Sequence, residues 1–206
     1  SDKIVIKEGG VQDYGKDVIP VEKRMAALAH MEKVDKNKVA IVNAANVGGV
    51  EGGGIDGAIN NAGGKILIED RKKLPKVKGN DRILEGGAVT TGPNDYGELY
   101  GKYVIHAVGP DYRDYPNYDE ADEILISAYE SAMKEAERNN IEYLGFCLIS
   151  ASIFRENRSL EAVITIGVDT INENLYPGLK EVCIYGFKKE EYDILDSIYR
   201  YKYASR

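Results

Sequence analysis

The sequence predicts an α/β protein, a three-layer α/β/α sandwich around a mostly parallel mixed sheet of about six strands. Three observations support this fold class. Short apolar runs alternate along the chain with segments of helical periodicity, an order typical of parallel sheets covered by helices. The runs at 103–108, 143–149 and 182–185 are almost entirely apolar, as expected for strands buried on both faces. The length of 206 residues suits a single domain spanning 1–206.

Six segments have the length and composition of strands. They lie at 3–7, 39–44, 86–91, 102–108, 143–149 and 181–186. The first segment alternates polar and apolar residues and lacks the apolar core of a signal peptide. Since the longest apolar runs are also too short for the roughly 20 residues of a membrane span, we expect an intracellular protein, cytoplasmic or nuclear. A secreted effector fragment remains the alternative.

Helical segments separate these strands. A first helix is expected over 21–33, with Pro20 near its first turn. A pair of helices follows Gly54 and ends near 74–75, where Pro75 disfavours further helix. Apolar residues spaced three or four apart predict three more helices. Their apolar positions are Ile124, Leu125, Ala128, Ala132, Met133 and Ala136; Leu160, Val163, Ile164, Gly167, Val168 and Ile171; and Ile194, Leu195, Ile198 and Tyr199.

Charge and composition exclude several classes of function. The formal net charge is −7, which argues against binding nucleic acid, because a phosphate-backbone binder normally presents a basic face. Cys147 and Cys183 both fall in expected strands, so we interpret them as small core residues in a reducing compartment. The only histidines, His30 and His106, are far apart in sequence. We therefore expect no metal site and no cofactor.

The segment 39–57 has the sequence of a ligand-binding strand, loop and helix. An apolar strand ends in Asn43 and Asn46, and Gly52–Gly54 then precede Asp56 at the expected start of a helix. Glycines allow a close approach of the main chain to a ligand, and a helix N-terminus favours a diphosphate. A second segment, 149–155, leaves another strand. Because ligands of open α/β sheets bind beyond the carboxyl ends of the strands, we expect the two segments to form the walls of one cleft.

These motifs resemble the macrodomain family of ADP-ribose-binding modules. The resemblance is carried by Asn43-Ala44-Ala45-Asn46, by the run from Gly52 to Ile59, and by Ala62-Gly63-Gly64. It continues through 86–92 and 102–110 and is weakest over 8–36 and 111–120. The resemblance implies that 1–206 forms one macrodomain and that the ligand of the cleft is ADP-ribose.

The chain is similar in particular to the branch that removes ADP-ribose from proteins. That branch has an Asn ten residues before the Asp that follows the glycines, and Asn46 and Asp56 have this spacing. The poly-ADP-ribose glycohydrolase branch instead has a Q-E-E segment after its glycines, and no such segment follows Gly54. The resemblance therefore implies a mono-ADP-ribosyl hydrolase that cleaves the glycosidic bond between ADP-ribose and a modified side chain.

The resemblance assigns candidate roles in the first wall. Asp56 would orient or deprotonate the attacking water, with helix capping as the structural alternative. Asn46 would hold the distal ribose, or close a turn. Asn43 is expected to support the glycine loop. Gly52, Gly53, Gly54 and Ile55 would contact the distal ribose and the diphosphate through main-chain N–H groups.

The adenine end of the cleft is assigned by two features. The family has an Asp after an early strand that accepts a hydrogen bond from adenine, and Asp17 followed by Val18 is the best candidate. Asp13 and Asp35 remain alternatives. Phe187, after the last strand, is expected to stack on adenine, and Tyr185 and Tyr192 compete for this role.

The second loop departs from the family pattern S-x-G-x-[FY]-G. Ser150, Ala151, Ile153 and Phe154 match it as ligand contacts, whereas Ser152 and Arg155 stand at the two glycine positions. Ser152 can donate a hydrogen bond to a phosphate, but it puts a glycine-type main chain in question. Arg155 can pair with a phosphate or with an acidic protein surface, or remain a solvated charge.

The partner expected for this monomer is ADP-ribose or an ADP-ribosylated protein, including a ubiquitin-linked adduct. The sequence leaves open whether the linkage is to Asp/Glu, Arg, Ser or a small molecule. The alternative function is a reader that binds ADP-ribose without chemistry, because the divergent second loop can preserve binding and lose turnover. RNA binding is a third alternative, which the net charge disfavours.

Overall fold

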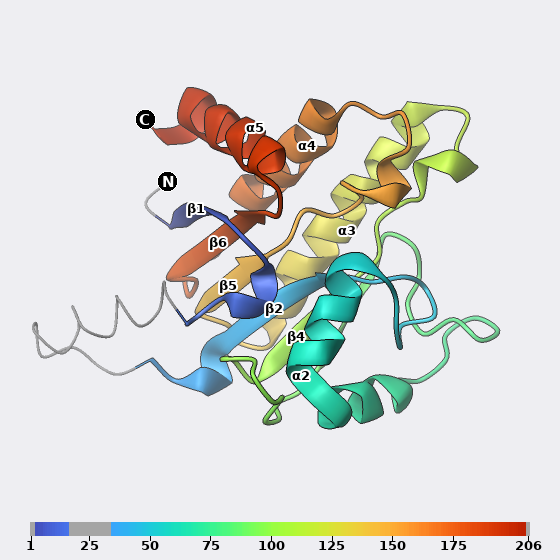
Figure 1. Cartoon of the computed structure of the whole chain (residues 1–206), viewed down its shortest axis with the longest axis vertical. Helices are drawn as coiled ribbons and strands as arrows, with labels where there is room; N and C mark the ends of the chain where they lie inside the picture. Colours follow the sequence, from blue (N-terminus) through green and yellow to red (C-terminus); the bar gives the residue numbers. More distant parts are fainter. Residues whose placement is uncertain (1–2, 17–33, 205–206) are drawn as a thin grey trace, which may run out of the picture.

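A computed structural model describes residues 3–16 and 34–204 of the chain. Within these residues, six strands form one sheet in the order β1-β6-β5-β2-β4-β3, and Figure 1 shows helices on both sides of it. The strands are β1 (Ile4–Glu8), β2 (Val39–Ala44), β3 (Ala88–Thr91), β4 (Tyr103–Ala107), β5 (Tyr143–Phe146) and β6 (Glu181–Gly186). All neighbouring strands are parallel except β3, which is antiparallel to β4. The predicted mixed, mostly parallel sheet is confirmed.

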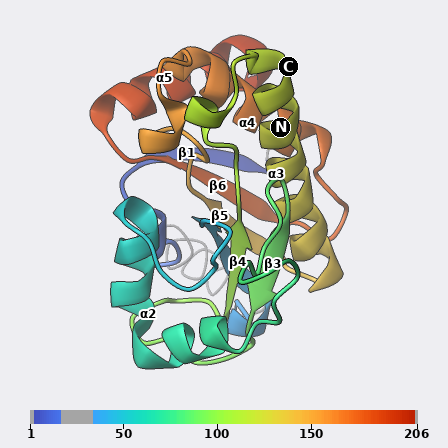
Figure 2. The ribbon, with the colours of Figure 1, turned by 90° about the vertical axis from the view of Figure 1, so that its right-hand side faces the viewer.

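Two helical layers cover the sheet. The helices are α2 (Gly54–Lys72), α3 (Tyr118–Arg138), α4 (Leu160–Glu173) and α5 (Lys189–Tyr199). Helices α3, α4 and α5 pack side by side on one face, and α2 contacts β2 on the other; Figure 2, a view from the side, shows the two layers apart. The expected helix at 21–33 lies outside the described residues.

Alternation along β2 explains how one strand supports both layers. Ala40 and Val42 belong to the core under α3 and α4, whereas Val39 and Ile41 pack with Ile59 of α2. Because successive side chains of a strand point to opposite faces, this apolar strand is buried on both sides. The apolar composition that predicted a covered strand is therefore explained.

Strand β5 ends earlier than the sequence predicts. The expected strand was 143–149, but the ladder with β2 and β6 ends at Phe146. The N–H of Ile149 donates to the hydroxyl of Tyr129 on α3, 2.8 Å away, and Ser150 has a φ of 55°. Residues 147–149 thus leave the sheet and become part of the loop above it.

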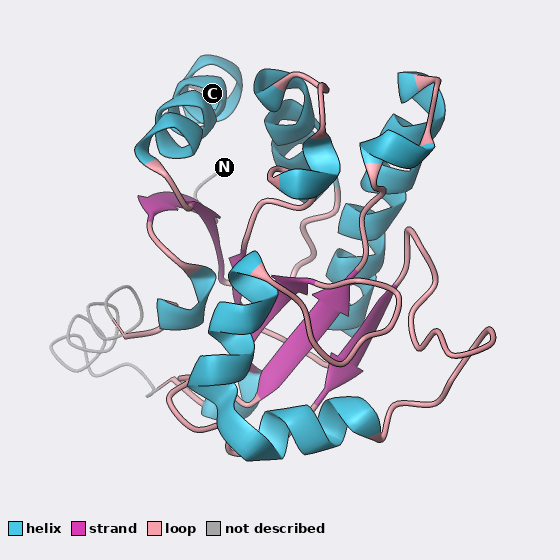
Figure 3. Ribbon diagram, turned by 45° about the vertical axis from the view of Figure 1, so that its right-hand side comes forward, coloured by secondary structure: helices cyan, strands magenta, loops and turns pink. Residues whose placement is uncertain are grey.

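Helix α2 is two helices joined at Gly64. This glycine has φ 73° and ψ −164°, far from helical values, and Figure 3 shows the resulting sharp bend between the two halves. The predicted pair of helices after Gly54 is thereby confirmed, and the second half runs in a clearly different direction from the first.

Candidate functional site

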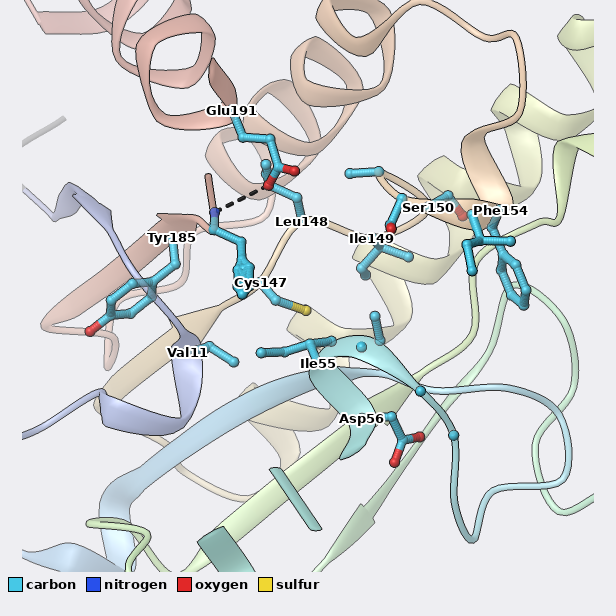
Figure 4. Close-up of a pocket in the computed structure, with 18 of the residues that line it drawn as sticks. Val11, Ile55, Asp56, Cys147, Leu148, Ile149, Ser150, Phe154, Tyr185 and Glu191 are labelled. Atoms are coloured by element: carbon cyan, nitrogen blue, oxygen red, sulfur yellow. Dashed lines mark hydrogen bonds between the residues drawn. The ribbon is translucent and has the colours of Figure 1, made fainter. Parts of the chain in front are cut away.

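A cavity of about 360 Å³ lies beyond the carboxyl ends of four parallel strands. Gly9 follows β1, Asn46 follows β2, Cys147 follows β5 and Phe187 follows β6, and all four line the cavity. Figure 4 shows the wall from α2 opposite the wall formed by 147–154. The two sequence segments expected to face each other across a cleft do so.

Asn46 organises the glycine-rich wall. Its amide nitrogen donates to the carbonyl of Glu51 (2.9 Å), and its amide oxygen accepts from the N–H of Gly49 (3.2 Å). A Cβ on Gly52 would lie 3.2 Å from that amide nitrogen, so Gly52 permits the close approach. An Asn amide has two N–H groups and two lone pairs. Asn46 therefore closes the loop and keeps one donor and one acceptor for a ligand.

Asp56 lies beside the cavity in a buried ion pair. Its side chain is 3% exposed, and that of Arg71 is fully buried. Arg71 Nη1 lies 2.5 Å from Asp56 Oδ1, and Nη2 lies 2.8 Å from Oδ2. This parallel pair of charge-assisted hydrogen bonds fixes the carboxylate plane.

The second wall is held by contacts from neighbouring elements. Ser150 Oγ donates to the carbonyl of Pro110 at 2.7 Å. Arg155 folds back on its own loop, where Nε donates to the carbonyl of Ala151 (3.2 Å) and Nη1 to that of Arg158 (2.9 Å). Ser152 has a φ of −115°, which needs no glycine. Serine and arginine are thus accommodated at the two positions where glycine was expected, and Arg155 braces the loop.

The positive φ that favours glycine occurs instead at Ser150 and at Glu156. The exposed residue Glu156 has φ 52° and ψ −117°, which costs a residue with a Cβ about 1–3 kcal/mol. We expect Glu156→Gly to raise the free energy of unfolding by about 1 kcal/mol, measured by denaturant unfolding. Asn157→Gly, at the next exposed position without a positive φ, is the control and should not stabilise. Equal effects of the two changes would contradict the assignment of strain to Glu156.

The opposite end of the cavity is open and aromatic. Phe187 is 61% exposed and its N–H donates to Glu191 Oε1 at 3.1 Å, as drawn in Figure 4. Tyr185 is buried and also lines the cavity, as does Val11. The exposed ring of Phe187 is free to pack against a flat ligand group.

Asn43 lies in the sheet below the cavity. Its register partner on β4 is His106, and Asn43 Nδ2 lies 3.0 Å from His106 Nδ1. The other ring nitrogen, Nε2, lies 2.9 Å from Thr91 Oγ1. Since the Asn43 amide donates, His106 Nδ1 accepts and Nε2–H donates to Thr91. Asn43 therefore bonds to the buried His106 and is not a lining residue, whereas the sequence suggested that it supports the glycine loop.

Most of the candidate residues meet at the cavity. Those that line it are Asn46, Gly52, Gly53, Gly54, Ile55, Asp56, Ser150, Ala151, Ser152, Ile153, Phe154 and Phe187. Asp17 and Val18 lie outside the described residues. Neither Asp13 nor Asp35 is among the described lining residues, and Asp35 instead caps the short helix at 36–38 through the N–H of Asn37.

Sequence reasoning missed several lining residues. They are Gly9, Val11, Cys147, Leu148, Lys188 and Glu191. The carboxyl ends of β1 and β6 were a usable signal for Gly9 and Lys188, because ligands bind at that edge. Burial raises the pKa of the Cys147 thiol to about 12, so this thiol is protonated at neutral pH and contributes to the cavity as an apolar group.

Within 3–16 and 34–204, no cluster of His, Cys, Asp and Glu has the composition of a metal site. Among the helices of the same ranges, none combines the length and apolar character needed to cross a bilayer.

The fold and the cavity define a class of protein: an α/β module that binds an extended ligand between two main-chain loops at the carboxyl edge of its sheet. The Macro domain family matches residues 42–163. That match covers more than half of the chain, and the chain belongs to the Macro domain family.

Known relatives and structures agree with this assignment. O-acetyl-ADP-ribose deacetylase 1 of Pantoea vagans is 36% identical over 75% of this chain and 86% of its own length. Mouse ADP-ribose glycohydrolase MACROD2 is 36% identical over 69% of this chain and 28% of its own. The structure of the Oceanobacillus iheyensis macrodomain with ADP is 25% identical, with a TM-score of 0.68, and covers 81% of this chain and 85% of that one.

Proposed function

We propose that this macrodomain binds ADP-ribose and hydrolyses the glycosidic bond between its distal ribose and a modified protein side chain. The observation that carries the proposal is the arrangement of one cavity. Asn46 and Asp56 line it from the glycine-rich wall, opposite Ser150–Phe154. The relatives named as a deacetylase and as a glycohydrolase of ADP-ribose compounds support the same class of reaction.

The electrostatics of the cavity suit a ligand held by main-chain groups. Among its described lining residues, Lys188 is the only lysine or arginine, and the chain as a whole has a net charge of −7. A diphosphate would therefore be bound by the N–H groups of Gly52–Gly54 at the start of α2 and by those of 150–154. Phe187, at the open end, is the candidate for stacking on adenine.

The chemistry assigned to the glycine-rich wall requires only water. The water oxygen bonds to C1 of the distal ribose while the bond from C1 to the side-chain oxygen or nitrogen breaks. A water proton passes to solvent through Asp56, and the leaving group takes up a proton. Each oxygen of a carboxylate can accept two hydrogen bonds, so Asp56 can hold a water while Arg71 occupies one site on each oxygen. Asn46 would hold the ribose in line with that water.

The test compares adducts of defined linkage. The purified protein is incubated with proteins mono-ADP-ribosylated on acidic, arginine or serine residues, and with O-acetyl-ADP-ribose, in water enriched in ¹⁸O. Glycosidic cleavage of an ester-linked adduct places ¹⁸O in the released ADP-ribose, whereas cleavage at the acyl carbon places it in the released carboxylate. We expect the first outcome, and Asn46→Ala should lower kcat by about 10²-fold.

A reader module is the alternative function. The second loop favours it, because Arg155 braces that loop through the carbonyls of Ala151 and Arg158 and thereby stabilises one fixed conformation. Calorimetry with ADP-ribose separates the cases. Binding of ADP-ribose without release of ADP-ribose from any adduct would establish the reader and refute the hydrolase.

A further inference from the structure

Arg71 is the most completely buried charged residue described, and every nitrogen of its guanidinium group makes a hydrogen bond. Nε donates to the carbonyl of Gly49 at 2.8 Å. Nη1 donates to Asp56 Oδ1 and to Asn60 Oδ1 (2.8 Å), and Nη2 donates to Asp56 Oδ2. Because burying an arginine is costly unless it is fully paired, this set of contacts indicates a specific role.

The bend at Gly64 brings Arg71 to these partners. Asp56 and Arg71 are 15 residues apart, which on a straight helix would separate them by about 22 Å. The non-helical conformation of Gly64 changes the direction of the second half of α2 sharply, as Figure 3 shows. The last turn of the helix thereby contacts its own first turn.

The contacts of Arg71 join both ends of the glycine-rich wall. Gly49 lies before the glycines, and Asp56 and Asn60 lie after them on the first two turns of α2. Asn60 Nδ2 also donates to the carbonyl of Val50 at 3.0 Å. Figure 4 shows the Asp56 carboxylate turned away from Ile55 and Ile149. One buried side chain therefore sets both the course of the loop and the direction of the carboxylate.

We propose that Arg71 is a positioning residue of the site, which fixes the Asp56 carboxylate and the loop 49–56 in the geometry that hydrolysis requires. The inference rests on the proposed function for its catalytic consequence. It predicts that the planar fork of arginine is needed as well as its charge, because only the fork bonds both carboxylate oxygens and the Gly49 carbonyl together.

The experiment uses three variants of the full chain. Arg71→Lys keeps the charge and removes the fork. The double variant Asp56→Asn/Arg71→Gln removes both charges and leaves a neutral amide pair, so that no buried charge is left alone. Lys72→Met, on the adjacent exposed position, is the matched control. The measurements are kcat, the Kd of ADP-ribose, and hydrogen exchange of amides 48–57.

We expect Arg71→Lys to lower kcat by about 10²-fold, with a smaller change in Kd, because a displacement of about 1 Å has this effect on a reaction. The double variant also lacks the Asp56 carboxylate and should lower kcat at least as far. Exchange of amides 48–57 should rise in both, with the strands still protected, and Lys72→Met should match the wild type. Unchanged kcat or unchanged exchange of 48–57 in Arg71→Lys would overturn the proposal. If the wild type releases no ADP-ribose, the proposed function fails, and the exchange measurement alone still decides whether Arg71 positions the loop.

Discussion

Lowering the pH from 7.5 to 5.0 is expected to reduce the free energy of unfolding through His106 alone, by at most about 2 kcal/mol. Complete burial, together with the nearby charge of Arg71, lowers the pKa of His106 well below its usual value. The unfolded chain therefore binds a proton near pH 6.5, whereas the folded chain does not. Stability from this residue is present above pH 6.5 and is lost, at up to about 1.4 kcal/mol per pH unit, as the pH falls from there toward the lowered pKa of the folded protein.

Denaturant unfolding at several pH values measures this slope. His106→Gln removes the titrating group, so the difference in slope between wild type and variant isolates His106 from the carboxylates and from His30. The variant should be less stable than the wild type at pH 7.5, because Asn43 and Thr91 lose their imidazole partner. Its slope between pH 6.5 and 5.0 should be flatter. Parallel slopes would show that His106 is not held neutral in the folded protein.

The hydrogen-bond partners of the buried polar groups around His106 could not be predicted from the sequence. The segment 39–44 was correctly predicted as a strand because its apolar side chains have one physical explanation, burial on both faces. The side-chain amide of Asn43, in the same strand, can form hydrogen bonds either with the glycine loop or within the sheet. Only the register of β2 against β4, which pairs Asn43 with His106, distinguishes them.

The main-chain conformation of the second loop could not be predicted from the sequence either. Its position was predictable, since Ile149–Arg155 follow a strand whose carboxyl end lies at the cleft. Its internal conformation was not, because the sequence does not show which residue takes the positive φ. Ser152 and Arg155 were the residues in question, and the structure assigns positive φ to Ser150 and Glu156.

Arg71 could not be assigned from sequence for a geometric reason. Residues 15 positions apart on one helical segment do not meet, so Arg71 gave no sign of a relation to Asp56. The available signal was Gly63-Gly64 inside a helical pattern, since glycine in a helix interior costs about 1 kcal/mol. The structure shows that this pair marks the bend that forms the ion pair.

Gly64→Ala is therefore expected to lower the free energy of unfolding by about 1–3 kcal/mol, although the new methyl group would meet nothing within 4 Å. The cost is conformational, because φ 73° with ψ −164° is a region that residues with a Cβ scarcely occupy. Gly178→Ala, equally open and without a positive φ, is the control and should not destabilise. Both are measured by denaturant unfolding.

Gly64→Ala should also alter the structure of the cavity wall, because the bend brings Arg71 into contact with Asp56. An alanine that straightens the helix at residue 64 would withdraw the guanidinium group from Gly49 and from the carboxylate, which are its partners in the folded chain. We expect amides 48–57 of Gly64→Ala to exchange faster than those of Gly178→Ala when the two are compared under native conditions. If Gly64→Ala lost stability while amides 48–57 stayed protected, the bend would be a feature of the helix alone, without a part in shaping the site.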